Sequence, residues 1–133
     1  TLPVTIESLE DNIGVSSSTA SFVASLGSTV GMNGCGGVFP AIVAIFVANV
    51  FGIELTLTHY ILMILTIVVG SVGIAGVPGA ATMSTTLILT TLGLPIEGMA
   101  IILGVDAIID MARTLTNVTG AGLAAYIVDK ECK

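Results

Sequence analysis

The sequence predicts an all-α membrane protein whose apolar segments are interrupted twice. The first observation is its composition, because 54% of the 133 residues are hydrophobic and only 9% are charged, whereas a soluble domain is about 25% charged. The mean hydropathy is +1.09. The second observation is that glycine-rich stretches at residues 31–37 and 75–79 divide the apolar runs. The third is a stripe of polar side chains within the last apolar segment, residues 98–129.

The few charged residues limit the classes of function. Only three residues are basic, so nucleic-acid binding is not expected. Cys35 and Cys132 lack the paired spacing of a disulfide framework or a metal site. Most carboxylates fall at predicted segment ends, where water or lipid headgroups can solvate them: Glu7, Glu10, Asp11, Glu54, Glu97, Asp129 and Glu131.

Residues 1–18 are the most polar part of the chain, and we interpret them as a connection along the membrane surface. The sequence TIESLEDNIGV predicts a short amphipathic helix that ends near Gly14. The serines and threonine of residues 16–19 then offer an N-cap for the following helix.

The apolar run at residues 19–53 is predicted to be a membrane helix broken in its middle. Residues 31–37 contain four glycines, and each costs a helix interior about 1 kcal/mol relative to alanine, so the helix should unwind there. Irregular backbone at membrane depth needs protein or an aqueous cavity around it, and such breaks often bind ions and polar ligands. Close helix packing through small residues is the alternative explanation.

Residues 57–92 are two apolar runs that flank the sequence AGVPG at residues 75–79. The second run, residues 80–92, would be roughly 20 Å long as a helix, which is too short to cross a bilayer. We therefore predict a re-entrant helical hairpin whose tip is buried in the protein. A polar turn at residues 54–58 precedes it, and we interpret His59 as an interfacial histidine rather than a proton relay.

The last apolar segment contains Arg113, the only arginine in the chain. On one continuous helix its polar side chains share a stripe, at about 100° per residue: Asp106, Asp110, Arg113, Thr114 and Asn117, with Ala121 at the end. Charges at membrane depth face a protein interior or a water-filled path. One interpretation is an internal ion pair between Arg113 and an aspartate. The other is a polar ligand site, in which Arg113 takes a carboxylate and Asp110 an ammonium group.

Three motifs in order resemble the dicarboxylate/amino acid:cation symporter family, the glutamate-transporter-like proteins. These are the Gly-Val-Pro-Gly tip, the sequence Gly93-Leu94-Pro95, and the string DxxxDMxRTxxNVxG at residues 106–120. The resemblance covers essentially the whole chain. It implies a multi-pass protein of the cell inner (plasma) membrane, a homotrimer whose subunits each move a transport domain against a static scaffold in the lipid bilayer.

The resemblance also implies how the chain is divided. Residues 1–133 would be the C-terminal part of a transport domain, cut from a larger transporter. Its parts would be the end of a first re-entrant hairpin and a connection (1–18), a broken helix (19–53), a second re-entrant hairpin (57–92) and the substrate-binding helix (95–129).

Roles for individual residues follow from the same resemblance. Asp110 would bind the α-ammonium group of an amino-acid substrate, Asn117 its α-carboxylate, and Arg113 a distal carboxylate. Thr114 would hydrogen-bond nearby, and Cys35 would face the substrate. Gly76 and Val77 would line the hairpin tip, acting as a lid. No cofactor is implied, but sodium is the expected coupling ion, bound by the backbone carbonyls of Thr29, Ser71, Val72 and Ile74.

The chain departs from the family pattern at two ion ligands. The family's usual Asn-Met-Asp-Gly-Thr string is Gly-Met-Asn-Gly-Cys here, so Asn33 replaces an aspartate. Ala121 replaces a second aspartate. Sodium binding in a low-dielectric site depends on such negative charge, so at least one sodium site should be weak or absent. Coupling would then rest on the carbonyl site or partly on protons.

The stretch around Cys35 resembles the cystine-transporter branch of the family, where an N-G-C-x-G-x2-P-A pattern is found. Cystine presents a carboxylate at each end, so it could use Arg113. Aspartate or glutamate would use Arg113 in the same way, so an acidic amino acid or dicarboxylate remains the alternative substrate.

Two other classes of protein were weighed against a symporter. Gly104-Val105-Asp106 faintly resembles an intramembrane aspartyl protease motif. However, Asp106 and Asp110 lie one turn apart beside Arg113, whereas a protease dyad needs two carboxylates from different elements. A purely structural helix bundle would explain an ion pair, but not two helix breaks combined with a charged stripe.

Overall fold

The computed structural model describes residues 2–132, and every regular element in that range is a helix. Thr1 and Lys133, the two ends of the predicted domain, lie outside the described residues. The elements are α1 (Leu2–Asp11), α2 (Ser17–Thr29), the π-helical turn η1 (Gly34–Val38), α3 (Phe39–Val50), α4 (Leu57–Val72), α5 (Ala80–Thr91), the 3-10 turn η2 (Ile96–Gly98), α6 (Met99–Leu103) and α7 (Asp106–Glu131). The predicted all-α class is therefore confirmed.

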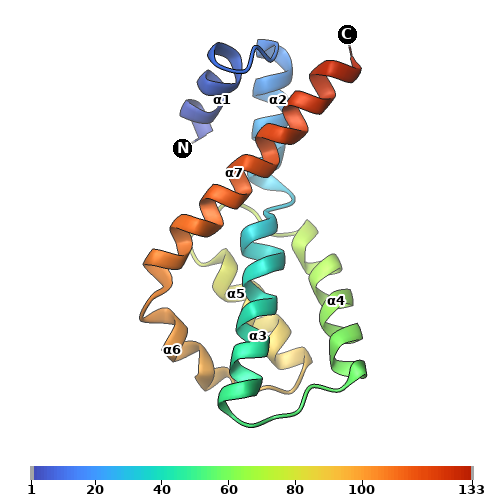
Figure 1. Ribbon diagram of the computed structural model, residues 1–133, viewed down its shortest axis with the longest axis vertical. Helices are drawn as coiled ribbons and strands as arrows, with labels where there is room; N and C mark the ends of the chain where they lie inside the picture. Colours follow the sequence, from blue (N-terminus) through green and yellow to red (C-terminus); the bar gives the residue numbers. More distant parts are fainter. Residues whose placement is uncertain (1, 133) are drawn as a thin grey trace.

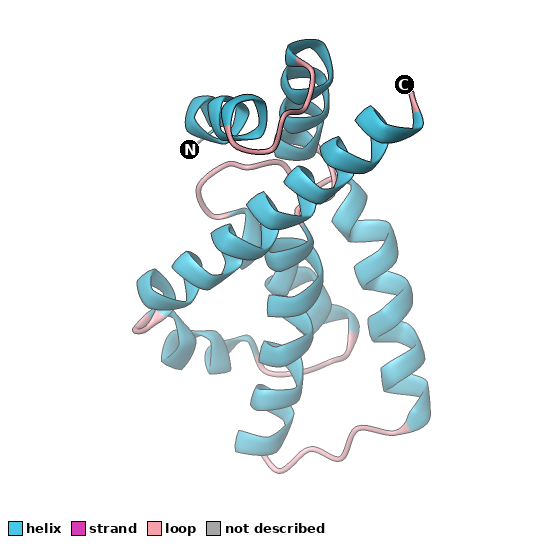
Figure 2. Ribbon diagram, turned by 45° about the horizontal axis from the view of Figure 1, so that its top comes forward, coloured by secondary structure: helices cyan, strands magenta, loops and turns pink. Residues whose placement is uncertain are grey.

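The helices form two packed groups that α7 joins (Figure 1). In the larger group, α3 packs against α5, with Val43, Val47, Ile88 and Leu89 almost wholly buried. Burying each such side chain contributes roughly 1.5–3 kcal/mol. In the smaller group, α1 and α2 pack against the C-terminal part of α7 around Ala125. Figure 2 shows α7 running obliquely between the groups.

The first glycine-rich stretch leaves the α-helical path. Helix α2 ends at Thr29, and Val30 is extended with φ −138° and ψ 136°. Gly31 has φ +81°, a left-handed conformation that favours glycine. The chain then re-enters helical geometry through η1. We call residues 30–38 the first interruption. Among the described residues, one stretch is long and apolar enough to cross a membrane: Ser17–Val50, which includes the first interruption. Leu57–Val72 is a shorter apolar helix.

The second glycine-rich stretch also separates two helices. After α4, residues 73–79 have no helical structure, and Gly79 with φ +83° precedes α5. We call residues 73–79 the second interruption. At the other end of α4, His59 has a specific partner that the sequence did not reveal. Its Nδ1 accepts the Thr56 backbone N–H at 3.1 Å, completing a capping box.

The last segment is not one continuous helix, which corrects the prediction for residues 98–129. Helix α6 ends at Leu103, and α7 begins at Asp106. Between them Val105 has φ −117° and ψ 4°, and its N–H bonds to the carbonyl of Ile102 in a tight turn. Asp106 therefore lies in the first turn of α7, where the helix dipole favours a negative charge.

Asp129 is a second correction, since it is buried rather than solvated at a segment end. Its side chain is 6% exposed and accepts the backbone N–H and the hydroxyl of Ser16, at 3.0 and 2.5 Å. Ser16 lies at the predicted N-cap of α2, but its hydroxyl makes no cap hydrogen bond to that helix. A buried carboxylate needs such donors to offset its lost hydration.

Candidate functional site

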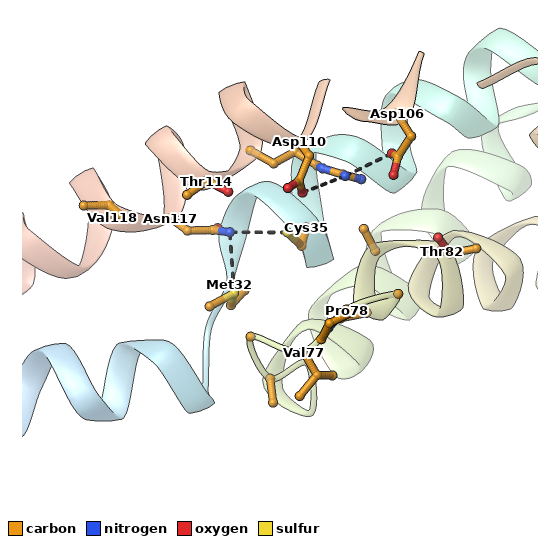
Figure 3. Close-up of a pocket in the computed structure, with 16 residues that line it drawn as sticks. Met32, Cys35, Val77, Pro78, Thr82, Asp106, Asp110, Thr114, Asn117 and Val118 are labelled. Carbon is orange, nitrogen blue, oxygen red and sulfur yellow. Dashed lines mark hydrogen bonds and ion pairs between the residues drawn. The ribbon is translucent and has the colours of Figure 1, made fainter. Parts of the chain in front are cut away.

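A cavity of about 490 Å³ lies between α7 and the two interruptions. Figure 3 shows Val77 and Pro78 on the opposite side of this cavity from Asp110, Thr114 and Asn117. All seven residues predicted to bind substrate line it: Cys35, Gly76, Val77, Asp110, Arg113, Thr114 and Asn117. The fold thus brings together residues from three separate parts of the chain.

Arg113 is the most buried charged group of the cavity, with 6% of its side chain exposed. Its Nη2 lies 2.9 Å from an oxygen of Asp106 and 2.8 Å from an oxygen of Asp110. The ion pair that the sequence suggested is therefore present, with both aspartates. Yet Nε and Nη1 of Arg113 have no hydrogen-bond partner in the described part of the chain. Buried guanidinium donors without partners are costly, so Arg113 retains N–H donors that can bind an anionic group.

Asn117 joins α7 to the first interruption. Its Oδ1 accepts the backbone N–H of Gly34 at 2.7 Å. Its Nδ2 donates to Sγ of Cys35 at 3.3 Å and lies 3.5 Å from Sδ of Met32. In this structure the amide predicted to bind the α-carboxylate therefore holds the backbone and two sulfur atoms of residues 32–35.

Two glycines, which have no side chain, allow α7 to pack closely against its neighbours. A methyl group on Gly34 would lie 2.6 Å from the carbonyl oxygen of Arg113. A methyl group on Gly27 of α2 would lie 2.9 Å from Cβ of Ala121. Both distances are shorter than real Cβ atoms permit, so α2 and the first interruption pack directly against the backbone of α7.

The second interruption has fewer attachments. The backbone N–H of Gly76 donates to the carbonyl of Ser28 at 2.9 Å, and that of Val77 donates to Ala75 at 2.8 Å. The Val77 side chain is 58% exposed. One wall of the cavity is thus a loop held to α2 by a single inter-segment backbone bond among those of the described residues.

The four residues predicted to bind sodium through their carbonyls do not line this cavity. Thr29 ends α2, Ser71 and Val72 end α4, and Ile74 lies in the second interruption. The Gly76–Ser28 bond brings these two segments together next to Thr29. Their roles therefore stay predictions, made on segments that the fold places side by side.

Several cavity residues were not among the predicted site residues. Asp106 lies on the predicted stripe, so its position on α7 was a sufficient signal. Met32 lies in the glycine-rich stretch, beside Cys35. Thr82 belongs to the first turn of α5. The many hydroxyl side chains of that helix were the only sequence feature that could have indicated its place in the site.

Comparison with known proteins agrees with this geometry. The profile of the Sodium:dicarboxylate symporter family matches residues 1–131. An uncharacterized symporter of Haemophilus influenzae is 43% identical over 131 residues, covering 98% of this chain and 30% of that protein. The L-cystine uptake protein TcyP of Bacillus anthracis is 39% identical over 130 residues, covering 97% and 28%.

A third relative is named for a different substrate. The proton/sodium-glutamate symport protein of Bacillus subtilis is 43% identical over 129 residues, covering 97% of this chain and 30% of that protein. The chain therefore spans about 30% of the length of these relatives.

Proposed function

The chain belongs to the Sodium:dicarboxylate symporter family, and on this premise we propose that the protein is a secondary active symporter for an amino acid with carboxylates at both ends. L-cystine is the favoured substrate. The family is one of transporters, so the protease alternative is set aside. Sodium, protons or both would supply the coupling.

The observation that carries this proposal is the chemistry of the cavity between α7 and the two interruptions. Asp110, 58% exposed, provides a negative group for an α-ammonium. Arg113 provides buried, unpartnered donors for a carboxylate. Thr114 and Asn117 follow along the same helix face. An exposed carboxylate and a cation with unpartnered donors in one small cavity suit a zwitterion that carries a further carboxylate.

Two features favour cystine over a smaller acidic amino acid. The relatives include L-cystine uptake proteins of several Bacillus strains. The cavity lining includes Cys35, a small side chain at the position of the family's usual threonine. The second candidate, an aspartate or glutamate symporter, is favoured by the similarity to the glutamate symport protein.

Weak sodium coupling is proposed from the two replaced aspartates. Asn33 is neutral, and Ala121, whose Cβ packs against Gly27, carries no charged group. We propose that sodium binds the backbone carbonyls of Thr29, Ser71, Val72 and Ile74. Asp106 and Asp110 would be the carboxylates available for proton coupling.

The finer architecture is also part of the proposal. The first interruption would be the break of a transmembrane helix, and α4 and α5 would be the arms of a re-entrant hairpin, with Val77 in its lid. Apolar side chains exposed along α4, such as Leu65 and Val69, suit a lipid or scaffold contact. The complete protein would be a multi-pass homotrimer of the plasma membrane, working by an elevator motion.

Replacing Arg113 tests the proposal. In vesicles containing the complete gene product, Arg113→Ala should abolish uptake of cystine and acidic amino acids. It should admit neutral amino acids, because Asp110 and Asn117 would still bind the shared amino-acid moiety. Arg113→Lys keeps the charge but not the planar donors, so it should weaken binding without neutral uptake. Thr116→Ala, on an exposed position of α7, is the control. Unchanged uptake in Arg113→Ala would end the proposal.

A further inference from the structure

A phenylalanine outside the cavity lining covers the guanidinium group of Arg113. The Cζ atom of Arg113 lies 4.2 Å from the centre of the Phe39 ring. Both side chains are 6% exposed. A cation this close to an aromatic face is attracted by the ring quadrupole, and burial strengthens the attraction because water does not screen it. Phe39 is therefore an electrostatic partner of Arg113, not only a neighbour.

The π-helical turn explains how Phe39 reaches this position. The backbone N–H of Phe39 donates to the carbonyl of Gly34, which is an i→i+5 bond. In an α-helix, residues five apart point in directions about 140° apart, at about 100° per residue. In a π turn, which has more residues per turn, the angle between them is much smaller. Gly34 contacts the backbone of Arg113, and the same face then presents Phe39 to the guanidinium group.

The remaining surroundings of Arg113 fix which of its edges is available. Asp106 and Asp110 both occupy Nη2. Phe39 covers a face of the guanidinium plane, and the donors without a partner are Nε and Nη1. A guanidinium group held by a ring and two carboxylates has lost most of its rotational freedom before a ligand binds. Preorganisation of this kind raises affinity by reducing the entropy lost on binding.

We propose that Phe39 is a positioning residue that determines specificity for the second carboxylate of the substrate. It acts through Arg113 by fixing the plane of the guanidinium group. This inference rests on the proposed function. It differs from a packing role, which Phe39 also has in the core of α3 and α5. A packing role predicts equal losses for all substrates, whereas positioning predicts a loss confined to substrates that carry the distal carboxylate.

The test measures uptake in vesicles containing the complete gene product. For Phe39→Leu we expect the KM for the transported two-carboxylate amino acid to rise roughly 5- to 30-fold, from loss of a buried cation–π contact. In the Arg113→Ala background, which should admit neutral amino acids, adding Phe39→Leu should leave the KM for L-serine unchanged. Phe39→Tyr retains the ring and should restore most of the affinity. Phe46→Leu is the matched control, since Phe46 packs on the same core from the same helix.

Ring electronics separate the two roles more sharply. Successively fluorinated phenylalanines at position 39 keep the ring shape but weaken its quadrupole, so the KM should rise with each fluorine. An unchanged KM across that series would overturn the inference while leaving the proposed function intact. So would equal effects of Phe39→Leu and Phe46→Leu on the KM for the two-carboxylate amino acid and, in the Arg113→Ala background, on the KM for L-serine. If the unaltered protein takes up no two-carboxylate amino acid, the proposed function itself fails, and the inference with it.

Discussion

The two interruptions border the same cavity but are held very differently. The first is fastened to α7 by the Gly34–Asn117 hydrogen bond and by close backbone packing at Arg113. Gly34 and Gly36 within it are buried. The second is held to α2 by the Gly76–Ser28 bond, and its residues 76–79 are exposed.

This difference suggests a division of labour within the site. A segment with many buried contacts opens only at a high free-energy cost, whereas an exposed loop with few bonds moves easily. We therefore interpret the first interruption as a fixed wall that positions Arg113, and the second as the movable part. The predictions below test that contrast, from the largest expected effect to the smallest.

Gly34→Ala should have the largest effect. The new methyl group would lie 2.6 Å from a backbone oxygen of Arg113, and α7 cannot yield as a flexible side chain would. We expect a loss of about 3 kcal/mol in stability, at the upper end of overpacking costs, together with loss of uptake. Thermal unfolding in detergent and vesicle uptake measure the two effects.

Gly37→Ala is the control in the same turn, because its methyl group would meet only Ile67 at an ordinary 3.9 Å. Its Tm should be unchanged or slightly higher. A Gly34→Ala protein as stable and active as Gly37→Ala would show that the first interruption is not a fixed wall.

In the absence of substrate, Asn117→Ala should increase local opening of the first interruption. The Gly34 N–H would lose its partner, and an unsatisfied buried donor costs about 1–3 kcal/mol. Hydrogen exchange at residues 32–36 should therefore accelerate, while exchange in α5 stays constant. Thr116→Ala, whose hydroxyl bonds only to its own helix, should change neither. Equal protection of residues 32–36 in both variants would contradict the role given to Asn117.

Gly76→Ala should have a smaller effect on stability, about 1 kcal/mol or less. Its methyl group would lie 2.7 Å from Cε of Met32, the end of a flexible side chain that can move. It would also lie 3.1 Å from the carbonyl oxygen of Ser28, so the backbone there must shift by a few tenths of an ångström. Because the second interruption is interpreted as the movable part, we expect the KM to change more than the Tm. A Tm loss as large as that of Gly34→Ala would remove the distinction between the two interruptions.

The last prediction concerns the unaltered protein, whose uptake should depend only weakly on sodium concentration. With Asn33 and Ala121 in place of carboxylates, uptake should depend on sodium with a Hill coefficient near one. Measuring initial uptake rates over a sodium titration at constant ionic strength tests this. A steep dependence would mean that further sodium sites operate despite the two neutral residues.

Much of the cavity could be predicted because its chemistry is visible in the sequence. Charged residues are rare in so apolar a chain, so Asp110 and Arg113 identified the face of the last segment that borders the cavity. The glycine-rich stretches identified the places where the backbone leaves the α-helix. These signals depend on local composition, which one sequence contains in full.

Other features depend on contacts between distant residues and could not be predicted in this way. Asp129 is buried because Ser16, far away in sequence, supplies two donors. Phe39 reaches Arg113 only through a π turn, and a helical periodicity of 3.6 residues places it on another face. The turn at Gly104 and Val105, which ends α6 before Asp106, was likewise hidden within an apolar pattern.

Uptake of labelled L-cystine and L-aspartate by the complete gene product in vesicles, with and without a sodium gradient, tests the central claim most directly. We expect concentrative cystine uptake that resists excess aspartate and is lost in Arg113→Ala. Aspartate uptake without cystine uptake would favour the second candidate substrate and would still agree with this cavity as the binding site. Uptake of neither compound, or uptake that Arg113→Ala leaves unchanged, would contradict the claim that this cavity binds an amino acid with two carboxylates.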